Sequence, residues 1–424
     1  MSSSGNTVSI ERTAHPICDG TPVPTYPGNL RVLHVLPSLD PRSGGVAEAV
    51  VQFVKHMLPY GCVSEVATLD TSDGPRFDRL CGAVHRLGPG FGSYGMSRRL
   101  MVWMRENASR YDAIIVHGIW QFHSLAAAWA VFRKGTPLFV FPHGMLDPWF
   151  QHTYPAKHVK KRIYWMLFER WVFRRANAVL FTCQTELELA LKPFLDRKLP
   201  LRVNGFGIES VPGDKACGQL FRDTFPELRD KRVLLFLSRI HEKKGCDLLI
   251  GAFAKVAPQH PDVRLVIAGP GDPSLVNRLK RQALDLQVDR NIVWTGMLSG
   301  ELKWAALRAA ELFVLPSHQE NFGIAVVESL ASGTPVLITN RVNIWQEIVE
   351  SGGGWVCADT EKGVADALQR WCADTTADQR RLLGMMALEC YQNDFQIEAA
   401  ARRLTDTVAE ATCSELPSCP ETTV

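Results

Sequence analysis

Short apolar runs alternate with stretches of helical periodicity along most of the chain. One series of predicted strands begins at Leu30–Leu36, and a second series begins at Arg232–Leu237. Such alternation is typical of parallel sheets covered by helices on both faces. The predicted strands are Leu30–Leu36, Val63–Leu69, Ala113–His117, Leu138–Phe141, Ala178–Thr182, Leu201–Val203, Arg232–Leu237, Arg264–Ala268, Asn291–Trp294, Glu311–Leu315, Val336–Ile338 and Gly354–Cys357. We therefore predict an α/β protein with two Rossmann-like domains.

The length of 424 residues also favours two domains over one core. The segment Glu209–Leu228 is polar and is interpreted as the interdomain link. The predicted divisions are a disordered tail at 1–28, a first domain at 29–208, a linker at 209–230, a second domain at 231–385, a C-terminal helix at 386–410 that packs back toward the first domain, and a tail at 411–424.

Composition argues against several classes of protein, namely nucleic-acid-binding, disulfide-rich and membrane-spanning proteins. A formal charge of +3 is too small to indicate nucleic acid as the main partner. The eleven cysteines are scattered without metal-binding spacing, which favours a reducing compartment over a zinc or disulfide framework. The N-terminus lacks the pattern of a signal peptide, and no apolar run reaches the roughly 18–20 residues of a membrane span. We expect a cytoplasmic protein that could also associate peripherally with the inner face of the membrane.

The stretch Glu311–Ile338 combines strand, loop, helix and strand around two acids. Glu320 lies at the predicted mouth of the helix and Glu328 lies eight residues further on, so both can face one crevice at the end of the strand. Alternatively, Glu320 is an acid favoured by the helix dipole and Glu328 is solvated. The apolar neighbours of Glu328 favour a partnered carboxylate.

Two other loops follow predicted strands. Arg239 and Lys244 lie after Arg232–Leu237, where two cations and a helix N-terminus could hold a diphosphate. The alternative is a solvated basic loop. Gly44 and Gly45 precede a predicted helix, where they allow close approach to an anion or form an ordinary turn. Cations for phosphates beside carboxylates for hydroxyls predict a nucleotide-sugar site.

These motifs resemble those of the retaining glycosyltransferases of family 4, of the polysaccharide-biosynthesis type, which have the GT-B fold. The matching segments are SRIHEKKG at 238–245, AGPGD at 268–272 and HQENFGIAVVESLASGTPV at 318–336, with SGGV at 43–46, HGM at 143–145 and NGFG at 204–207. The resemblance covers about residues 30–410 and is more specific in the second half. It implies two Rossmann-like domains facing a central cleft, a donor held mainly by the second domain, and no obligatory metal or other cofactor.

For the second domain, the resemblance implies that Arg239 and Lys244 clamp the donor diphosphate and stabilise it as it leaves. Glu328 would bind the nucleotide ribose, and Glu320 would bind hydroxyls of the donor sugar. Further donor contacts would come from the amides of Asn321, Phe322 and Gly323. Many relatives have proline at position 321, and we expect the asparagine to alter loop rigidity more than chemistry.

For the first domain, the resemblance implies that Gly44 and Gly45 touch the phosphates from the opposite wall. His143 matches a family histidine that contacts the sugar near the reacting carbon, although it could also simply cap its strand. His117 ends a strand in the same way and is a candidate for the acceptor side. We count Glu320, His143, Arg239 and Lys244 as the catalytic candidates.

The predicted reaction moves a hexosyl unit from a UDP- or GDP-sugar with retention of configuration, by front-face displacement stabilised by the two cations. The sequence does not separate uridine from guanosine. The rival interpretations are an inactive nucleotide-sugar-binding subunit of a polysaccharide assembly complex and a GT-B nucleotide-sugar epimerase.

The segment Lys157–Arg175 carries seven Lys or Arg residues, one acid and five interleaved aromatic residues. A basic, aromatic-rich amphipathic helix suits an anionic membrane surface. The alternative is a domain-packing helix with a solvated basic end. Family members often contact lipid-linked acceptors with such a helix, so we expect a polyprenyl-diphosphate-linked saccharide as the acceptor in polysaccharide assembly.

Overall fold

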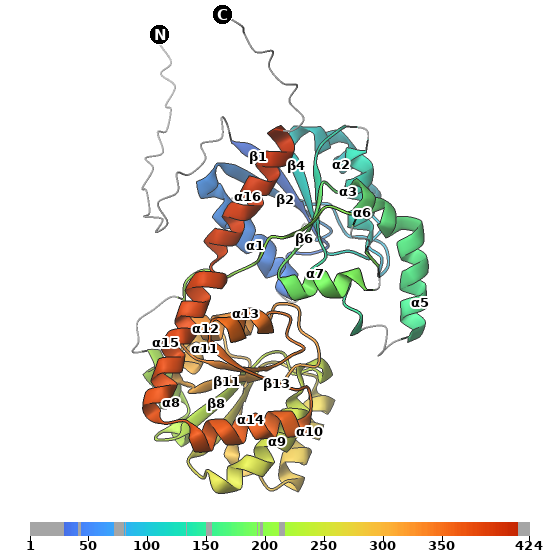
Figure 1. The fold of residues 1–424 in the computed structure, drawn as a ribbon. Helices are drawn as coiled ribbons and strands as arrows, with labels where there is room; N and C mark the ends of the chain where they lie inside the picture. Colours follow the sequence, from blue (N-terminus) through green and yellow to red (C-terminus); the bar gives the residue numbers. More distant parts are fainter. Residues whose placement is uncertain are drawn as a thin grey trace, which may run out of the picture.

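The computed structural model shows two α/β domains, each built on a parallel sheet (Figure 1). It describes residues 29–40, 44–71, 80, 82–132, 134–149, 155–192, 194–195, 198–211 and 217–413. The predicted tail at 1–28 lies outside these residues, as does the predicted tail at 411–424 beyond residue 413. The first sheet, in spatial order, consists of β3 (Val84–Arg86), β2 (Cys62–Thr68), β1 (Leu30–Val35), β4 (Ala113–His117), β5 (Leu138–Phe141), β6 (Ala178–Phe181) and β7 (Leu201–Val203).

The second sheet repeats this arrangement with six strands, and all of its strand pairs are parallel. In spatial order they are β10 (Ile292–Gly296), β9 (Val263–Ala268), β8 (Arg232–Leu237), β11 (Leu312–Leu315), β12 (Val336–Thr339) and β13 (Gly354–Cys357). The central strands have no polar face because both sides of the sheet are covered.

Helices cover both faces of each sheet. In the first domain they are α1 (Gly45–Met57), α2 (Arg98–Asn107), α3 (Phe122–Val131), α5 (Pro155–Tyr164), α6 (Arg170–Arg175) and α7 (Gln184–Leu191). In the second domain they are α8 (Cys217–Thr224), α9 (Cys246–Val256), α10 (Pro273–Asp285), α11 (Gly300–Ala309), α12 (Ile324–Ala331), α13 (Trp345–Glu350) and α14 (Glu361–Asp374). The chain ends with α15 (Ala377–Asp394) and α16 (Ile397–Cys413).

Each sheet has one topological switch point, between β1 and β4 in the first and between β8 and β11 in the second. In open parallel sheets, ligands bind beyond the carboxyl ends of the strands at such points. All the loops that the sequence analysis selected after β1, β4, β8 and β11 lie there. The topology therefore predicts a ligand site at the loops that follow β1, β4, β8 and β11.

The chain crosses between the domains twice, and the two crossings lie side by side. Ile208 accepts a hydrogen bond from the Ile397 amide at 3.2 Å and donates one to the Phe395 carbonyl at 3.0 Å. After this point α16 packs on α1 of the first domain, while α15 packs on α12 of the second (Figure 1). One buried apolar cluster runs from Phe53 and Phe206 to Phe322 and so joins the domains.

The segment expected to be a linker is partly structured. Residues 217–224 form α8, which packs on α11, and Phe221 is fully buried. The polar neighbours of Phe221 hide this short helix from a periodicity argument. The predicted C-terminal helix is also divided, because the chain changes domain at Phe395 rather than near residue 386.

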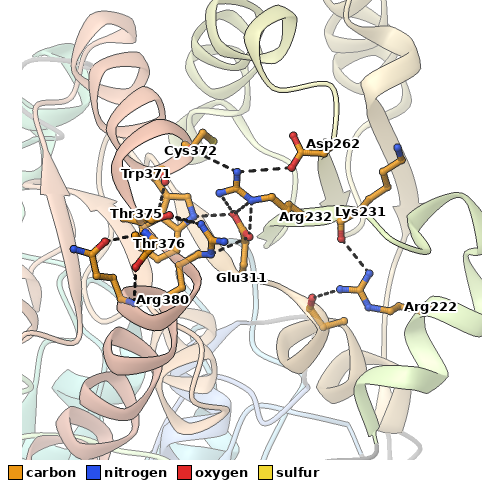
Figure 2. Close-up of polar contacts among 12 residues, drawn as sticks. Arg222, Lys231, Arg232, Asp262, Glu311, Trp371, Cys372, Thr375, Thr376 and Arg380 are labelled. Carbon is orange, nitrogen blue, oxygen red and sulfur yellow. Dashed lines mark hydrogen bonds and ion pairs between the residues drawn. The ribbon is translucent and has the colours of Figure 1, made fainter.

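An ion-pair network holds the C-terminal helices to the second sheet, at the end opposite the candidate site. Figure 2 shows Arg232 and Glu311 facing each other, with guanidinium–carboxylate distances of 2.9–3.2 Å. The indole of Trp371 on α14 donates to Glu311 at 2.9 Å, and Arg380 on α15 lies 3.6 Å from it. Because these groups are largely buried and share partners, we assign them a structural role.

Candidate functional site at the domain junction

The loop after β8 approaches the loop after β11 closely. Gly245 has a φ of 67°, and a Cβ there would lie 2.0 Å from the carbonyl oxygen of Pro316. The amide of His318 donates to the carbonyl of Lys243 at 2.8 Å. Glycine at position 245 is therefore required both by its backbone conformation and by this close approach. The contact brings the predicted cationic loop beside the predicted acidic loop.

Lys244 and Glu320 are in direct contact across these two loops, ammonium to carboxylate. Their side chains are largely buried, with exposed fractions of 16% and 19%. Burial and the positive charges of Arg239 and Lys243 lower the pKa of Lys244 to about 8. The exposed Arg239 makes no ion pair with any described residue. Lys244 and Glu320, which were selected as separate site residues, thus lie together, with Arg239 close enough to perturb the pKa of Lys244.

The acidic loop is pinned on its other side. The amide of Glu320 donates to the Arg341 carbonyl, and its carbonyl accepts from the Asn343 amide, both at 3.0 Å. Gly323, with a φ of 74°, then caps the N-terminus of α12. Phe322 is buried against Phe206, with ring centroids 4.8 Å apart, so its side chain belongs to the core and only its backbone could contact a ligand.

Glu328 has a partner that the sequence analysis missed. The ammonium of Lys303, on α11, lies 2.6 Å from its carboxylate. Burial raises the pKa of Glu328; Lys303 opposes this effect, and the negative charge of Glu48 on α1 adds to it. A Cβ on Gly45 would lie 3.4 Å from Ile324, the first residue of α12. The diglycine turn of the first domain therefore lies against the helix that carries Glu328.

His143 stands on a strained loop beside this junction. Its φ of 50° is in the left-handed region, which residues with a side chain rarely adopt. The next amide, of Gly144, donates to the carboxylate of Glu186 at 2.5 Å. Glu186 is buried and also accepts from the amide and hydroxyl of Thr182, at 2.8 and 2.6 Å. Burial raises the pKa of Glu186 and these hydrogen bonds oppose the shift.

His117 is placed differently from the expectation. It has no exposed surface, so in this structure it cannot line an acceptor site directly. Its Nδ1 lies 3.0 Å from Nε2 of His143 instead. The strand end that carries His117 turns its ring into the core because the ring stacks on Phe141, at 5.5 Å between centroids. His117 is therefore placed to orient the ring of His143 through this hydrogen bond.

Asn321 spans the two domains. Its amide nitrogen donates to the hydroxyl of Thr182 at 3.1 Å, and its oxygen accepts from Asn343 at 3.2 Å. Gly144 faces it so closely that a Cβ would lie 2.6 Å from the Asn321 side chain. The residue that departs from the family pattern therefore contributes a polar contact across the junction, which proline could not make.

A cavity of about 410 Å³ opens between Trp149 of the first domain and α9 and α10 of the second. The ammonium of Lys243 lies 4.6 Å from the Trp149 ring centre, and Gln319 donates to Asp147 at 3.2 Å. Together with the Asn321 contact, these interactions join residues of the first domain to residues of the second.

The basic segment is helical and lies at the edge of the first domain (Figure 1). A π-helical turn, Trp165–Glu169, separates α5 from α6. Val159, Ile163, Met166 and Leu167 are all more than half exposed, whereas Trp165 and Glu169 are buried. None of the helices in the described part of the chain combines the length and the hydropathy of a membrane-spanning segment. The helix therefore presents an apolar face to its surroundings while it packs through the other.

The described residues contain no group of three or more His, Cys, Asp or Glu side chains that could hold a metal ion. The donor set around Lys244 consists instead of cations and hydrogen-bonding carboxylates. Such a set suits phosphates and sugar hydroxyls.

Comparison with known proteins yields matches to both domains. The family model described as "Glycosyl transferase 4-like domain" matches residues 44–202, and the model described as "Glycosyl transferases group 1" matches residues 220–384. Mannosylfructose-phosphate synthase of Agrobacterium fabrum is 26% identical over 343 residues, which is 72% of this chain and 73% of that protein.

Alpha-monoglucosyldiacylglycerol synthase of Streptococcus pneumoniae is 28% identical over 240 residues, which is 55% of this chain and 53% of that protein. This second match therefore spans only about half of the relative. Among solved structures, Anabaena Alr3699/HepE in complex with UDP and glucose is similar with a TM-score of 0.71 at 18% identity, over 90% of this chain and 100% of that chain. The structural likeness extends over both domains and confirms the predicted fold.

Proposed function

Because this chain belongs to the GT-B glycosyltransferases, we propose that it transfers a hexosyl unit from a UDP- or GDP-sugar to a saccharide acceptor, with retention of anomeric configuration. The observation that carries this proposal is the contact of Lys244 with Glu320, beside Arg239 and at the junction of the two domains. A cation held against a carboxylate in a largely buried site is available for a diphosphate and a sugar hydroxyl at once.

In the proposed reaction, the bond between the anomeric carbon and the diphosphate oxygen breaks while a bond to the acceptor oxygen forms on the same face. The acceptor hydroxyl gives its proton to the departing phosphate oxygen. Arg239 and Lys244 stabilise the negative charge that develops on that phosphate. Glu186 is the acid that is hydrogen-bonded to the His143–Gly144 loop. Its carboxylate accepts hydrogen bonds from Gly144 and Thr182, so it is not free to act as a nucleophile, and this supports the front-face route.

The remaining roles follow from position. Glu320 binds hydroxyls of the donor sugar, and Glu328, oriented by Lys303, binds the ribose. The backbone of Asn321–Gly323 and the turn at Gly44 and Gly45 contact the phosphates from opposite domains. His143 contacts the sugar near the reacting carbon. The two cations supply the charge that a metal would otherwise provide, so we propose that no metal is required.

We propose a lipid-linked acceptor of the polyprenyl-diphosphate class, in the assembly of an exopolysaccharide or lipopolysaccharide-type glycan at the cytoplasmic face of a membrane. The support is the exposed apolar face of α5 and the π-helical turn, set among the basic residues of 157–175. The streptococcal relative is named for a glycolipid product, which agrees with an acceptor at a lipid surface.

The test has two stages. A thermal-shift screen of UDP- and GDP-sugars should show stabilisation by one base class, because a ligand at about 100 times its Kd adds about 2.7 kcal/mol. The selected donor, labelled in the sugar, should then transfer to a polyprenyl-diphosphate-linked saccharide in vesicles, with or without EDTA. NMR of the product should show the donor's anomeric configuration. Binding without turnover would indicate an inactive subunit, and release of a free epimer would indicate an epimerase.

A further inference from the structure

Three histidines of the first domain, His34 and His117 fully buried and His143 partly buried, form a continuous hydrogen-bonded chain that ends at His143. Nε2 of His34, on β1, lies 3.3 Å from the hydroxyl of Ser64 on β2. Nδ1 of His34 lies 2.9 Å from Nε2 of His117, and Nδ1 of His117 lies 3.0 Å from Nε2 of His143. The rings also stack, with centroid distances of 5.1 Å and 5.3 Å along the chain.

This chain is held inside the sheet. His34 and His117 have no exposed surface, and burial lowers the pKa of His34 and His143 to about 3 and that of His117 well below its usual range. The rings are therefore neutral at physiological pH. His123, which is buried but outside the chain, lies 3.1 Å from the His117 carbonyl through its Nε2 and so holds the backbone there.

Neutrality imposes a direction on the chain. A neutral imidazole carries one N–H and one lone pair, so each ring that donates at one nitrogen must accept at the other. The three rings must therefore all donate in the same sense along the chain. The tautomer of His143 is consequently coupled to the direction of the hydrogen bond between Ser64 and His34, with the rings of His34 and His117 in between.

Only one sense leaves a donor for the ligand. If Ser64 donates to His34, then His34 donates to His117 and His117 donates to Nε2 of His143, which places the proton of His143 on Nδ1. Within the described residues, no hydrogen bond is found for that Nδ1. Phosphate oxygens only accept hydrogen bonds, so an N–H at this position can stabilise the negative charge that grows on the departing diphosphate, whereas a lone pair repels that charge.

We propose that Ser64, His34 and His117 are positioning residues that fix His143 as its Nδ1–H tautomer and so orient it as a hydrogen-bond donor to the sugar nucleotide. This inference rests on the proposed function only in the identity of the ligand. The relay itself is a property of the first domain and does not depend on turnover.

The direct test is the ring tautomer of His143 in the full-length protein with ¹⁵N-labelled histidine. Two-bond ¹H–¹⁵N correlation spectra distinguish Nδ1–H from Nε2–H rings, and a His143→Gln variant assigns the signal. We expect the Nδ1–H form in the wild type. A proton on Nε2 of His143 would overturn the proposal.

The second test removes the relay while keeping a ring in the core. In His34→Phe we expect the tautomer of His143 to become mixed and kcat to fall about tenfold, equivalent to about 1.4 kcal/mol, with less than a twofold change in donor KM. In His34→Gln, whose amide can still donate to His117, most of kcat should return. The matched control is His123→Gln, which alters a buried histidine outside the chain but keeps an amide that can donate to the His117 carbonyl, and it should leave the tautomer unchanged.

An unchanged tautomer and kcat in His34→Phe would overturn the relay, as would an equal kcat loss in the His123 control. If His34→Phe does not fold, the tautomer of His143 in the wild type and the tautomer and kcat of His34→Gln still test the relay. Failure of the wild type to bind or use any sugar nucleotide would instead refute the proposed function, and the tautomer measurement would remain valid.

Discussion

Lys244 is the residue on which the proposed chemistry depends most. Its ammonium is held in a largely buried position near two other cations, which is a cost to folding that a bound diphosphate would offset. We expect Lys244→Ala to lower transfer by at least about 100-fold, as the loss of one charge-stabilising donor does in other enzymes. The unfolding free energy should fall, because the variant leaves the largely buried carboxylate of Glu320 without its ion-pair partner. Steady-state kinetics and urea unfolding measure the two quantities.

The matched control for this variant is Lys243→Ala. Lys243 lies in the same loop and carries the same charge, but it faces Trp149 and Gln319 rather than Glu320. Transfer by this control should stay within a few-fold of the wild type. Near-normal turnover by Lys244→Ala would remove Lys244 from the mechanism.

At the scale of single residues, the sequence could single out those candidate side chains that lie at strand ends or within one short motif. Lys244, Glu320 and Glu328 could be selected because residue spacing places them at one edge of a sheet. Lys303 and His34 could not, because their contacts join separate elements and each position alone is compatible with an ordinary helix face or a core strand. The sequence placed His117 correctly at the end of its strand, but the burial of its side chain is visible only in the packed structure.

At the scale of elements, the π-helical turn Trp165–Glu169 contains a buried carboxyl group whose effect on stability can be measured. Glu169 is fully buried; its Oε1 accepts from the Trp120 amide at 2.8 Å and from the Ser124 hydroxyl at 3.0 Å. Its Oε2 has no partner among the described residues. Burial raises the pKa of Glu169 to about 7, against the effect of the two hydrogen bonds.

Because the pKa of Glu169 is higher in the folded state, the folded protein binds this proton more tightly, and stability falls as pH rises from about 4.5 to about 7. Integrated over that window, the loss amounts to at most about 3 kcal/mol. We expect Glu169→Gln to lack this loss and to be more stable than the wild type at pH 8. Urea unfolding from pH 5 to 8 tests this, with the exposed Glu188→Gln as control. Parallel pH profiles for wild type and Glu169→Gln would contradict it.

The exposed apolar face of the same helix gives a prediction about membranes. Met166 and Leu167 are 71% and 64% exposed beside several basic residues. We expect the double variant Met166→Asp, Leu167→Asp to lose most of its flotation with anionic liposomes at low salt, because it removes apolar insertion and adds charge repulsion.

The control for that experiment is the double variant Leu382→Asp, Met385→Asp. These side chains are 56% and 70% exposed on α15 of the second domain, so they match the first pair in exposure and not in location. This control should float like the wild type. Wild-type protein that fails to float at low salt would favour a soluble acceptor.

Among elements, the strands of both sheets followed from runs of apolar residues, whereas three features did not. β3 has only three residues and none is fully buried, so no apolar run marks it. Helix α8 depends on one buried phenylalanine in a polar segment. The π-helical turn adds no compositional signal to a helix already expected across 157–175, although it decides which residues face outward.

At the scale of the whole molecule, the two-domain architecture was predictable because each domain repeats the same alternation of strands and helices. The contacts that hold the domains together were not predictable from that pattern. They depend on pairs such as Gly45 with Ile324 and Asn321 with Thr182, which lie far apart in the sequence. Such pairs have no common periodicity, and they appear only when both domains are built.

The contact between Asn321 and Thr182 allows a test of domain closure. One net hydrogen bond contributes about 0.5–1.5 kcal/mol, so its loss should shift an open–closed equilibrium by up to about tenfold. We expect Asn321→Pro, which has no amide side chain, to fold normally but to populate a more open arrangement without donor. Small-angle scattering should show a larger radius of gyration, and saturating donor should reverse the difference.

Thr182→Val provides the reciprocal variant, because it removes the hydroxyl that accepts from Asn321 while keeping the shape of the side chain. Its hydroxyl also donates to Glu186, so a small loss of stability should accompany the opening. Thr224→Val is the control, since among the described residues the Thr224 hydroxyl donates to the Leu220 carbonyl within α8 and to no group of the first domain. Scattering profiles of Asn321→Pro and Thr182→Val that match the wild type would show that this contact does not set the domain arrangement. Opening in both variants but not in the control would show that the Asn321–Thr182 hydrogen bond sets the domain arrangement, because the loss of this bond is what the two substitutions have in common.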